Sequence, residues 1–374
     1  MQQPFTNHFI TITDTRQDNR SHLLIDIIMI AICATLAGAE GWIEIARFGQ
    51  LKEAWFRKFL TLPNGIPSHD TIGRVFSLLD PEQFQACFTQ WIRSVVTLTN
   101  GQIVAIDGKT NRHTFGKDTK PLHLVSAWAT ANGVALGSVA TDVKSNEITA
   151  IPELLKVLDV SGCVITTDAM GCQSDIAADI VNQGGDYLLA VKGNQGLLYR
   201  DLKALFGAPE PQAQWGEALK TNTTEDRNHG RIELRRCEVL SGSDVIVKLR
   251  HKGNWLQLNT AVKVTATRTV VSTGAVTSFT RYYISSLVDP SAEYCQQAVR
   301  DHWGIENSLH WVLDMSFRED ESRIRTDHGP QNMAILRHIA LNLIKLDKDR
   351  TVGVKASIKK AGWDASYLEH LLGV

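Results

Sequence analysis

Three acidic residues stand where their side chains could do chemistry. Asp107 ends the apolar run IVAID, and Asp168 ends the similar run VITTD. An aspartate at a strand end points its carboxylate toward the rim of the sheet, where the sites of α/β proteins usually lie. Glu306 lies in the stretch VRDHWGIENSLHWVLD, midway between His302 and His310. Each aspartate alone is also compatible with a simple turn cap, so the chemistry depends on whether the acids meet.

The two aspartates become neighbours if their strands pair in parallel. Like charges held that close are unfavourable unless a cation lies between them. Three carboxylates, those of Asp107, Asp168 and Glu306, are enough to hold two divalent cations ~3.5–4 Å apart. Mg²⁺ and Mn²⁺ prefer such oxygen ligands. A pair of these ions suits the cleavage and transfer of phosphodiesters.

Two alternatives for the glutamate remain open. Predicted helical spacing over residues 291–317 puts His302, Glu306 and His310 on one face. A zinc site on one helix usually has histidines four residues apart, whereas these are eight apart. The other alternative is a packed amphipathic helix, which explains its apolar residues better than its central acid. The predicted core positions of that helix are Trp303, Ile305, Leu309, Val312 and Leu313.

The elements that must position these residues change in type along the chain. Residues 1–98 predict a helical domain, since apolar residues recur at helical spacing and no strand pattern is present. The apolar run 23–39 contains Asp26 and is shorter than the ~20 residues of a membrane span, so it predicts a buried helix. Ser68 or Asp70 is a plausible N-cap, and Pro81 lies near a helix start.

The rest of the chain predicts an α/β fold. Residues 99–206 follow the order β-β-β-α-β-α-β, which indicates a mixed sheet with helices packed on it. Residues 207–285 predict a β-rich insertion, and residues 286–374 return to helices. The strands expected in the insertion are 232–240, 245–251, 259–271 and 278–287, the last leading back to the main sheet.

Composition limits the class of protein. The chain has 374 residues, 43% of them hydrophobic and 21% charged, which is typical of globular proteins. A net charge of −1 gives no support to a nucleic-acid partner at the level of the whole chain, so such contacts need local patches. Six cysteines without a CxxC pair, and an N-terminus unlike a signal peptide, predict a reduced, cytoplasmic protein.

Three stretches together resemble a known family. AIDGKTNR, TTDAMG and HWGIENSLHWVLDMSFRED are similar to motifs of the DDE transposases of bacterial insertion sequences, in the H-repeat-associated, Rhs-linked subgroup. The resemblance covers almost the whole chain. It implies an RNase H-like catalytic core interrupted by the β-rich insertion. It also implies Asp107, Asp168 and Glu306 as catalytic, metal-binding residues for two Mg²⁺ or Mn²⁺ ions.

The chain departs from one signature of related transposases. They carry Tyr-x2-Arg-x3-Glu-x6-Lys around the glutamate, where this chain has Val299, His302 and Leu313 at the tyrosine, arginine and lysine positions. The departures concern contacts to the DNA backbone and leave the three acids untouched. His302 is a candidate replacement for the arginine as a phosphate donor.

Other residues are candidates for DNA contact or for support of the site. Asp314 is predicted to support it, while Glu319 and Asp320 are predicted to be surface residues. The candidate DNA-binding residues are Lys109, Arg112, Lys192, Asn194, Arg231, His302 and His310.

The favoured hypothesis is a transposase that cuts double-stranded DNA at element ends and joins the freed 3′-hydroxyl to target DNA. Because two ends must be held together, we expect a homodimer on DNA, associated with the nucleoid. The helical domain 1–98 is the candidate for end recognition, since helices suit the major groove. The alternatives are an RNase H-like nuclease that does not integrate and a DNA-binding relic without catalysis.

Overall fold

The computed structural model describes residues 5–16, 20–115, 120–141, 147–207, 215–228 and 230–373. The chain divides into two compact units. The first unit comprises Met1–Thr97, Gly108–Asn146 and Glu306–Val374, and the second unit comprises Leu98–Asp107 and Glu147–Ile305. The predicted domain boundaries after residues 98, 206 and 285 are not tested by this division and stay predictions.

The N-terminal part of the first unit is helical, as predicted. Its helices are α1 (Leu24–Leu36), α2 (Trp42–Leu51), α3 (Glu53–Phe56), α4 (His69–Leu78) and α5 (Pro81–Val95), after a 3₁₀ turn at Phe5–Phe9. The side chain of Ser68 caps α4, and Asp80 caps α5, which starts with a proline. Helix α1 is buried along its length, and Asp26 within it accepts a hydrogen bond from the backbone N–H of Leu62 at 2.8 Å.

The C-terminal helices complete the first unit. They are α12 (Trp311–Phe317), α13 (Gly329–Leu346), α14 (Val354–Trp363) and α15 (Ala365–Leu372), with a 3₁₀ turn at Glu319–Glu321. Helix α13 packs against α1, α4, α5 and strand β3 (Val134–Thr141). The buried amide of Asn342 donates to Ala135 O and accepts from Ala135 N, at 2.7 and 2.9 Å. This pair of hydrogen bonds fixes α13 on the β2–β3 hairpin.

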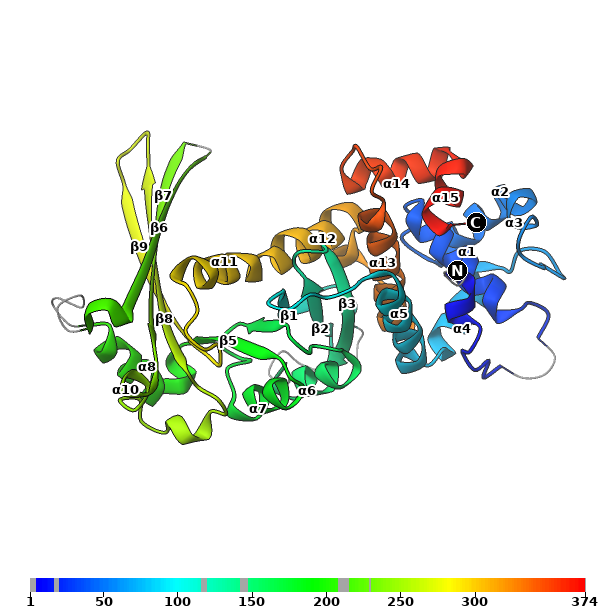
Figure 1. Ribbon diagram of the computed structural model, residues 1–374. Coiled ribbons are helices and arrows are strands. Elements are labelled where there is room, and N and C mark those ends of the chain that lie inside the picture. Colours follow the sequence, from blue (N-terminus) through cyan, green and yellow to red (C-terminus); the bar gives the residue numbers. More distant parts are fainter. Residues whose placement is uncertain are drawn as a thin grey trace. The chain divides into compact units, whose positions relative to one another are not determined.

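In the described residues, nine strands form one mixed sheet in the order β3-β2-β1-β4-β5-β9-β8-β7-β6 (Figure 1). Strands β1, β4 and β5 pair in parallel, whereas β5 and β9, and the strands beyond them, pair antiparallel. The remaining strands are β1 (Ile103–Asn111), β2 (Leu122–Ala129), β4 (Val164–Thr167), β5 (Asp186–Val191), β6 (Leu219–Asn228), β7 (Arg231–Ser241), β8 (Thr260–Val270) and β9 (Val276–Ser285). The order of elements from β1 to β5 is the predicted β-β-β-α-β-α-β.

Helices cover both faces of the sheet in the second unit. Figure 1 shows α6 (Glu147–Val157) and α7 (Ser174–Asn182) on one side of β4 and β5, and α11 (Ala292–His302) on the other. Buried residues of α11, among them Cys295 and Ala298, join an apolar cluster with Val164 and Leu188 of the strands. Burial of this apolar surface holds α11 against the strand that precedes Asp168.

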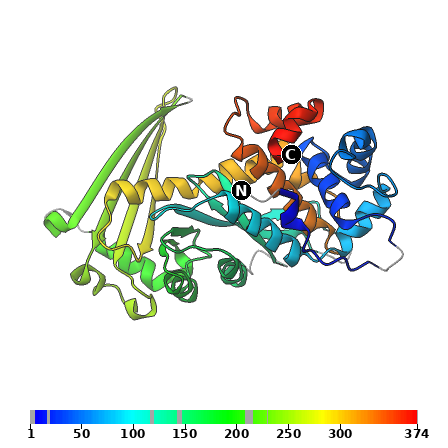
Figure 2. The ribbon, with the colours of Figure 1, turned by 45° about the vertical axis from the view of Figure 1, so that its right-hand side comes forward.

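The insertion extends the main sheet rather than forming a separate one. Figure 2 shows β6 to β9 as long twisted ribbons. The predicted strand at 245–251 is wrong: helix α10 (Ser243–Ile246) and turns occupy it, and Val245, Ile246 and Leu249 are buried at the spacing of a helical turn. Strand β6 was not predicted, because its sequence LKTNTTEDRN is polar and only alternate residues are shielded. Helix α8 (Gly196–Leu205) directly precedes the insertion.

The structure also bears on the predicted state of the cysteines and on membrane-spanning helices. All six cysteines are buried, and none forms a disulfide. Within the part of the chain that the structure describes, every helix is too short or too polar to cross a bilayer.

Candidate active site

Asp107 and Asp168 follow the paired segments of two neighbouring parallel strands. Asp168 directly follows β4, as predicted, but the prediction that Asp107 ends its strand is wrong, because β1 continues to Asn111. Strand β1 pairs with β4 from Ile103↔Val164 to Ile106↔Thr167, so the next residue on each strand is one of the two aspartates. Adjacent strands are ~4.8 Å apart. Both aspartates are half-buried. The parallel pairing that the sequence left conditional is therefore present, and it places two carboxylates side by side in the second unit.

The loop after β4 leaves one oxygen of Asp168 for other partners. Its Oδ1 accepts backbone N–H groups of Met170 at 2.8 Å and Gly171 at 3.4 Å, while its Oδ2 accepts no hydrogen bond from the described residues. The loop is tight at Gly171, where an added Cβ would lie 2.6 Å from the Cβ of Thr167. Asp168 thus shapes its own loop with one oxygen and can present the other to a ligand.

Two side chains that follow β5 hold the same loop. Asn194 donates to Ala169 O at 2.6 Å, and Gln195 donates to Cys172 O at 2.9 Å. Both belong to the second unit, as does Asp168. The prediction that Asn194 contacts DNA is not tested. In this structure its amide group binds the loop. The role of Gln195 was missed, although it stands beside Asn194 in the sequence.

Glu306 starts a π-helical turn. The single helix predicted over 291–317 is wrong, because α11 ends at His302 and a π-helical turn, Glu306–His310, precedes α12. The single helical face expected for His302, Glu306 and His310 therefore holds only for Glu306 and His310, whose side chains meet, because His302 belongs to the separate helix α11. Single π-turns inside helices occur frequently at functional sites. The Glu306 side chain is 50% exposed, and its Oε2 lies 3.5 Å from Nδ1 of the buried His310.

The apolar positions around this turn follow the predicted core in part, since Val312 is only half-buried. Ile305, Leu309 and Leu313 are buried. Trp303 is 45% exposed, so its predicted core position is wrong. The guanidinium of Arg281 lies 4.9 Å from the centre of the Trp303 ring, which stabilises the exposed indole.

The chain crosses between the two units next to two of the acids. Asp107 is the last residue before one crossing, and Glu306 is the first residue after another. Asp168 belongs to the second unit. The assignment of these three residues as one metal site stays a prediction.

The donor set fits hard divalent cations. All three predicted ligands offer carboxylate oxygens, which Mg²⁺ and Mn²⁺ favour over nitrogen or sulfur. The adjacent Asp107 and Asp168 are like charges whose repulsion a cation would relieve. Asp168 keeps Oδ2 available for this purpose.

Lys109 is part of a buried ion-pair network in the first unit. Its ammonium lies 2.7 Å from Asp314 Oδ1 and 2.8 Å from Glu319 Oε2. The prediction that Glu319 is a surface residue is wrong, since it is 1% exposed. Arg337, also buried, lies 4.0 Å from the second oxygen of Glu319. The network fixes β1, two residues after Asp107, against the turn that follows α12.

Burial and neighbouring charges shift the pKa values of Glu319 and Lys109 in opposite directions. Burial alone would raise the pKa of Glu319, but the positive charges of Lys109 and Arg337 outweigh it and lower the pKa to about 2. Burial would lower the pKa of Lys109, yet the negative charge of Glu319 raises it. Burial is the largest effect on Asp314 and raises its pKa. Glu319 and Lys109 are therefore both charged at neutral pH.

Some of the predicted DNA-contact residues are exposed, whereas others already bind partners within their own unit. Arg112 is 79% exposed, with a weak surface pair to Asp320, which is half-buried. Lys192 and Arg231 are exposed and form no ion pair with the described residues. The side chains of the other predicted contacts already have partners inside their own unit: Asn194 binds a backbone carbonyl, and the rest contact side chains. These residues are Lys109, Asn194, His302 and His310.

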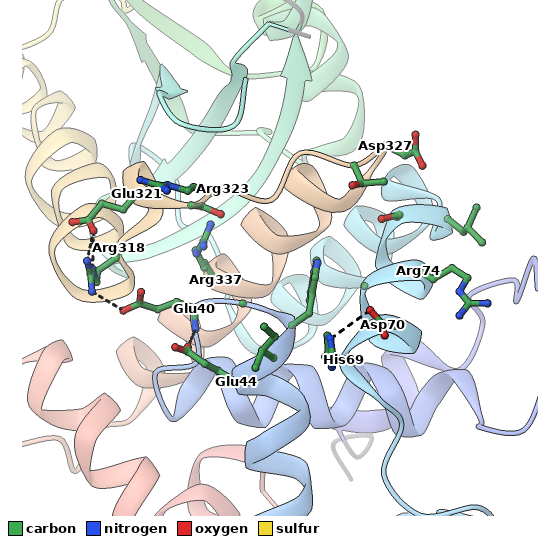
Figure 3. A pocket seen from close by; sticks show the side chains of 18 residues that line it. Glu40, Glu44, His69, Asp70, Arg74, Arg318, Glu321, Arg323, Asp327 and Arg337 are labelled. Carbon is green, nitrogen blue, oxygen red and sulfur yellow. Dashed lines mark hydrogen bonds and ion pairs between the residues drawn. The ribbon is translucent and has the colours of Figure 1, made fainter. Parts of the chain in front are cut away.

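A cavity of about 770 Å³ lies within the first unit (Figure 3). Some of its charged side chains pair with one another: Arg318 with Glu40 and Glu321, and His69 with Asp70. Arg337 contributes to its wall. The Arg318–Glu40 pair connects the segment after α12 with the residues just before α2.

Comparison with known families gives the class of the protein. Residues 77–343 match the family model described as "Transposase DDE domain", and residues 6–92 match the one described as "DDE_Tnp_1-associated". The chain therefore belongs to the DDE transposase family. The family resemblance inferred from the three motifs is confirmed.

The relatives narrow this to a subgroup. The chain is 39% identical to the "H repeat-associated putative transposase YhhI" of Escherichia coli K12 over 370 residues, covering 98% of this chain and 96% of YhhI. YbfD of the same strain, which carries the same description, is 42% identical over 243 residues, 64% of this chain and 95% of YbfD. The "Inactive transposase YbfQ" of that strain is 46% identical over 56 residues, 15% of this chain and 67% of YbfQ.

Proposed function

We propose that the chain is a DNA transposase that cuts double-stranded DNA at the ends of its element and transfers the freed strands to target DNA. The observation that carries the proposal is the register Ile106↔Thr167, after which Asp107 and Asp168 are the next residues of two neighbouring parallel chain segments. We infer an RNase H-like core from the strand order β3-β2-β1-β4-β5. Glu306 is the proposed third acid.

The proposed mechanism relies on positioning and on neutralisation of charge. Asp107, Asp168 and Glu306 would hold two Mg²⁺ or Mn²⁺ ions, which supply charge neutralisation at the phosphodiester and at the attacking oxygen. The backbone N–H groups of Met170 and Gly171 fix the Asp168 carboxylate through Oδ1, so that Oδ2 keeps one direction. Such pre-organisation lowers the barrier because little rearrangement is needed during reaction.

Double-stranded DNA is the proposed partner, at both element ends and target. We propose that two chains form a homodimer on DNA, since transposition joins two ends. Among the predicted contacts, Arg112, Lys192 and Arg231 are exposed and positively charged, which suits phosphate binding. The near-neutral net charge implies that binding depends on such local groups.

The test is cleavage and strand transfer by purified protein on linear DNA that carries the element ends, with Mg²⁺, Mn²⁺ or EDTA. Asp168→Asn and Glu306→Gln should abolish both reactions. Matched controls are Asp175→Asn on α7 and Glu293→Gln on α11, which are exposed and should retain activity.

Each outcome separates the candidate functions. Metal-dependent cutting and joining, lost in both site variants, supports the transposase. Cutting without joining indicates a nuclease. Specific binding without any reaction, unchanged in the variants, indicates a DNA-binding relic and contradicts the catalytic assignment.

A further inference from the structure

We propose that His302 is a positioning residue, which acts through its Nδ1 atom to hold the end of α11 on the strand that leads to Asp168. The inference rests on the proposed function, because it concerns how the proposed acids are oriented. It assigns His302 a role inside the protein, in place of the phosphate contact predicted from the sequence.

A part-buried hydrogen bond to a buried strand residue carries the inference. Nδ1 of His302 lies 3.0 Å from Oγ1 of Thr166. Thr166 belongs to β4, is 2% exposed and stands two residues before Asp168. Asp168 directly follows the last residue of β4, so a hydrogen bond at Thr166 acts on the strand segment that leads to it. The contact lies wholly within the second unit.

The position of His302 in its helix gives this contact its importance. It is the last residue of α11, and only three residues separate it from Glu306. Earlier residues of α11 are held by apolar contacts such as those of Cys295 and by the hydrogen bonds of Tyr294 to Gly101 O at 2.7 Å and of Gln296 to Thr224 at 2.8 Å. The hydrogen bond of His302 is likewise directional, and it acts at the last residue of the helix. It therefore fixes the point from which the chain leaves for the proposed third acid.

Two amide substitutions distinguish the roles of the two ring nitrogens of His302. Asparagine places its amide near the position of Nδ1, whereas glutamine places it near Nε2. If His302 acts through Thr166, His302→Asn should keep the hydrogen bond and His302→Gln should lose it. A phosphate contact through Nε2 predicts the reverse. Thr166→Val removes the hydroxyl with little change of shape, and Thr166→Ser retains it.

The experiment measures single-turnover cleavage of element-end DNA in Mg²⁺, together with the dissociation constant for that DNA. Since misplacement of about 1 Å costs on the order of 100-fold in rate, His302→Gln and Thr166→Val should cleave roughly 10- to 100-fold more slowly. His302→Asn and Thr166→Ser should stay within about 3-fold of wild type. DNA binding should be unchanged in all four variants, because positioning affects the chemical step rather than the encounter.

A second readout does not need activity. Mn²⁺ affinity, measured by electron paramagnetic resonance on the full chain, should weaken in His302→Gln and Thr166→Val and be retained in the other two. Circular dichroism identifies any variant that fails to fold.

Three results would overturn the proposal. The first is that all four variants have equal cleavage rates and equal Mn²⁺ affinities. The second is that His302→Asn loses cleavage while His302→Gln retains it. The third is that the main effect of the substitutions is weaker DNA binding. Failure of the wild type to cut DNA would count against the proposed function alone, while the Mn²⁺ series would still decide the role of His302.

Discussion

Glu319→Gln should destabilise the first unit strongly. The side chain is 1% exposed, and its carboxylate receives a hydrogen bond from Lys109 at 2.8 Å. The substitution keeps the shape but removes the negative charge. Lys109 then retains only Asp314 as an acidic partner, and the buried Arg337 loses its neighbouring charge. Removing one partner of a buried ion pair leaves an uncompensated buried charge.

The pKa of Glu319 gives the magnitude. Burial opposes ionisation, but the surrounding cations lower the pKa from 4.5 to about 2. At ~1.4 kcal/mol for each pH unit, this corresponds to about 3 kcal/mol of stability at neutral pH. The estimate agrees with the ~3–5 kcal/mol expected when a buried pair is broken. For a unit of about 200 residues, it lowers the melting temperature by roughly 6–12 °C.

Differential scanning calorimetry at pH 7 measures this change. Glu321→Gln is the matched control, since it lies in the same 3₁₀ turn but forms an exposed pair with Arg318. Its melting temperature should equal that of the wild type within error. A fall of less than about 2 °C in Glu319→Gln, or the same fall in the control, would refute the assigned role of the buried network.

Three further predictions test the same structural reasoning. The difference in melting temperature between wild type and Glu319→Gln should have its full size above pH 4.5 and should shrink as the pH falls toward about 2. The reason is that a lowered carboxyl pKa stabilises the fold only while the carboxylate is ionised. Calorimetry from pH 7 to pH 3 measures this difference. Asn194→Asp should reduce cleavage about 10-fold or more with unchanged DNA binding, because a carboxylate would face the loop carbonyl that the amide now binds; a wild-type rate would contradict the loop-holding role. Gly171→Ala should cost about 1–3 kcal/mol in urea unfolding, since its Cβ would meet Thr167 at 2.6 Å, whereas Gly196→Ala, with open space around it, should not destabilise.

The strand framework of the site follows from short-range sequence patterns. The apolar runs before Asp107 and Asp168 predicted two strands, and the pairing of β1 with β4 confirms that these strands are parallel neighbours. Apolar runs ending at a polar residue are informative because a parallel strand buried on both faces needs nearly continuous hydrophobic residues. The polar strand β6 lacks this signal, and sequence reasoning missed it.

The π-helical turn at Glu306 was beyond such patterns. A π-helical turn differs from an α-helical one in which backbone carbonyl accepts each N–H, and it adds only one residue to the helix. A helix with such a turn therefore has almost the same amino-acid composition as one without it. The exposed Trp303 is a second consequence, since its predicted burial assumed an uninterrupted helix. Its contact with Arg281 comes from a strand of the insertion and has no local sequence signal.

The burial of Glu319 was missed for a different reason. Charged residues are almost never fully buried unless paired, so a glutamate in the stretch FREDES is read as exposed. Its partner Lys109 is 210 positions away in the chain. Single-sequence reasoning cannot pair two charges at that distance without knowing the fold that brings them together.

These long-range pairs also change where DNA contacts should be sought. Lys109 and Asn194 were predicted as contacts because they closely follow conspicuous strand ends, yet each is bound to its own unit. Detaching either side chain to reach a phosphate would break a hydrogen bond and leave a buried or half-buried partner unsatisfied. The exposed Lys192 and Arg231 have no such cost, since neither pairs with a described residue. We therefore infer that groups close in sequence to the acids serve mainly to hold them, and that phosphate binding falls to exposed cations.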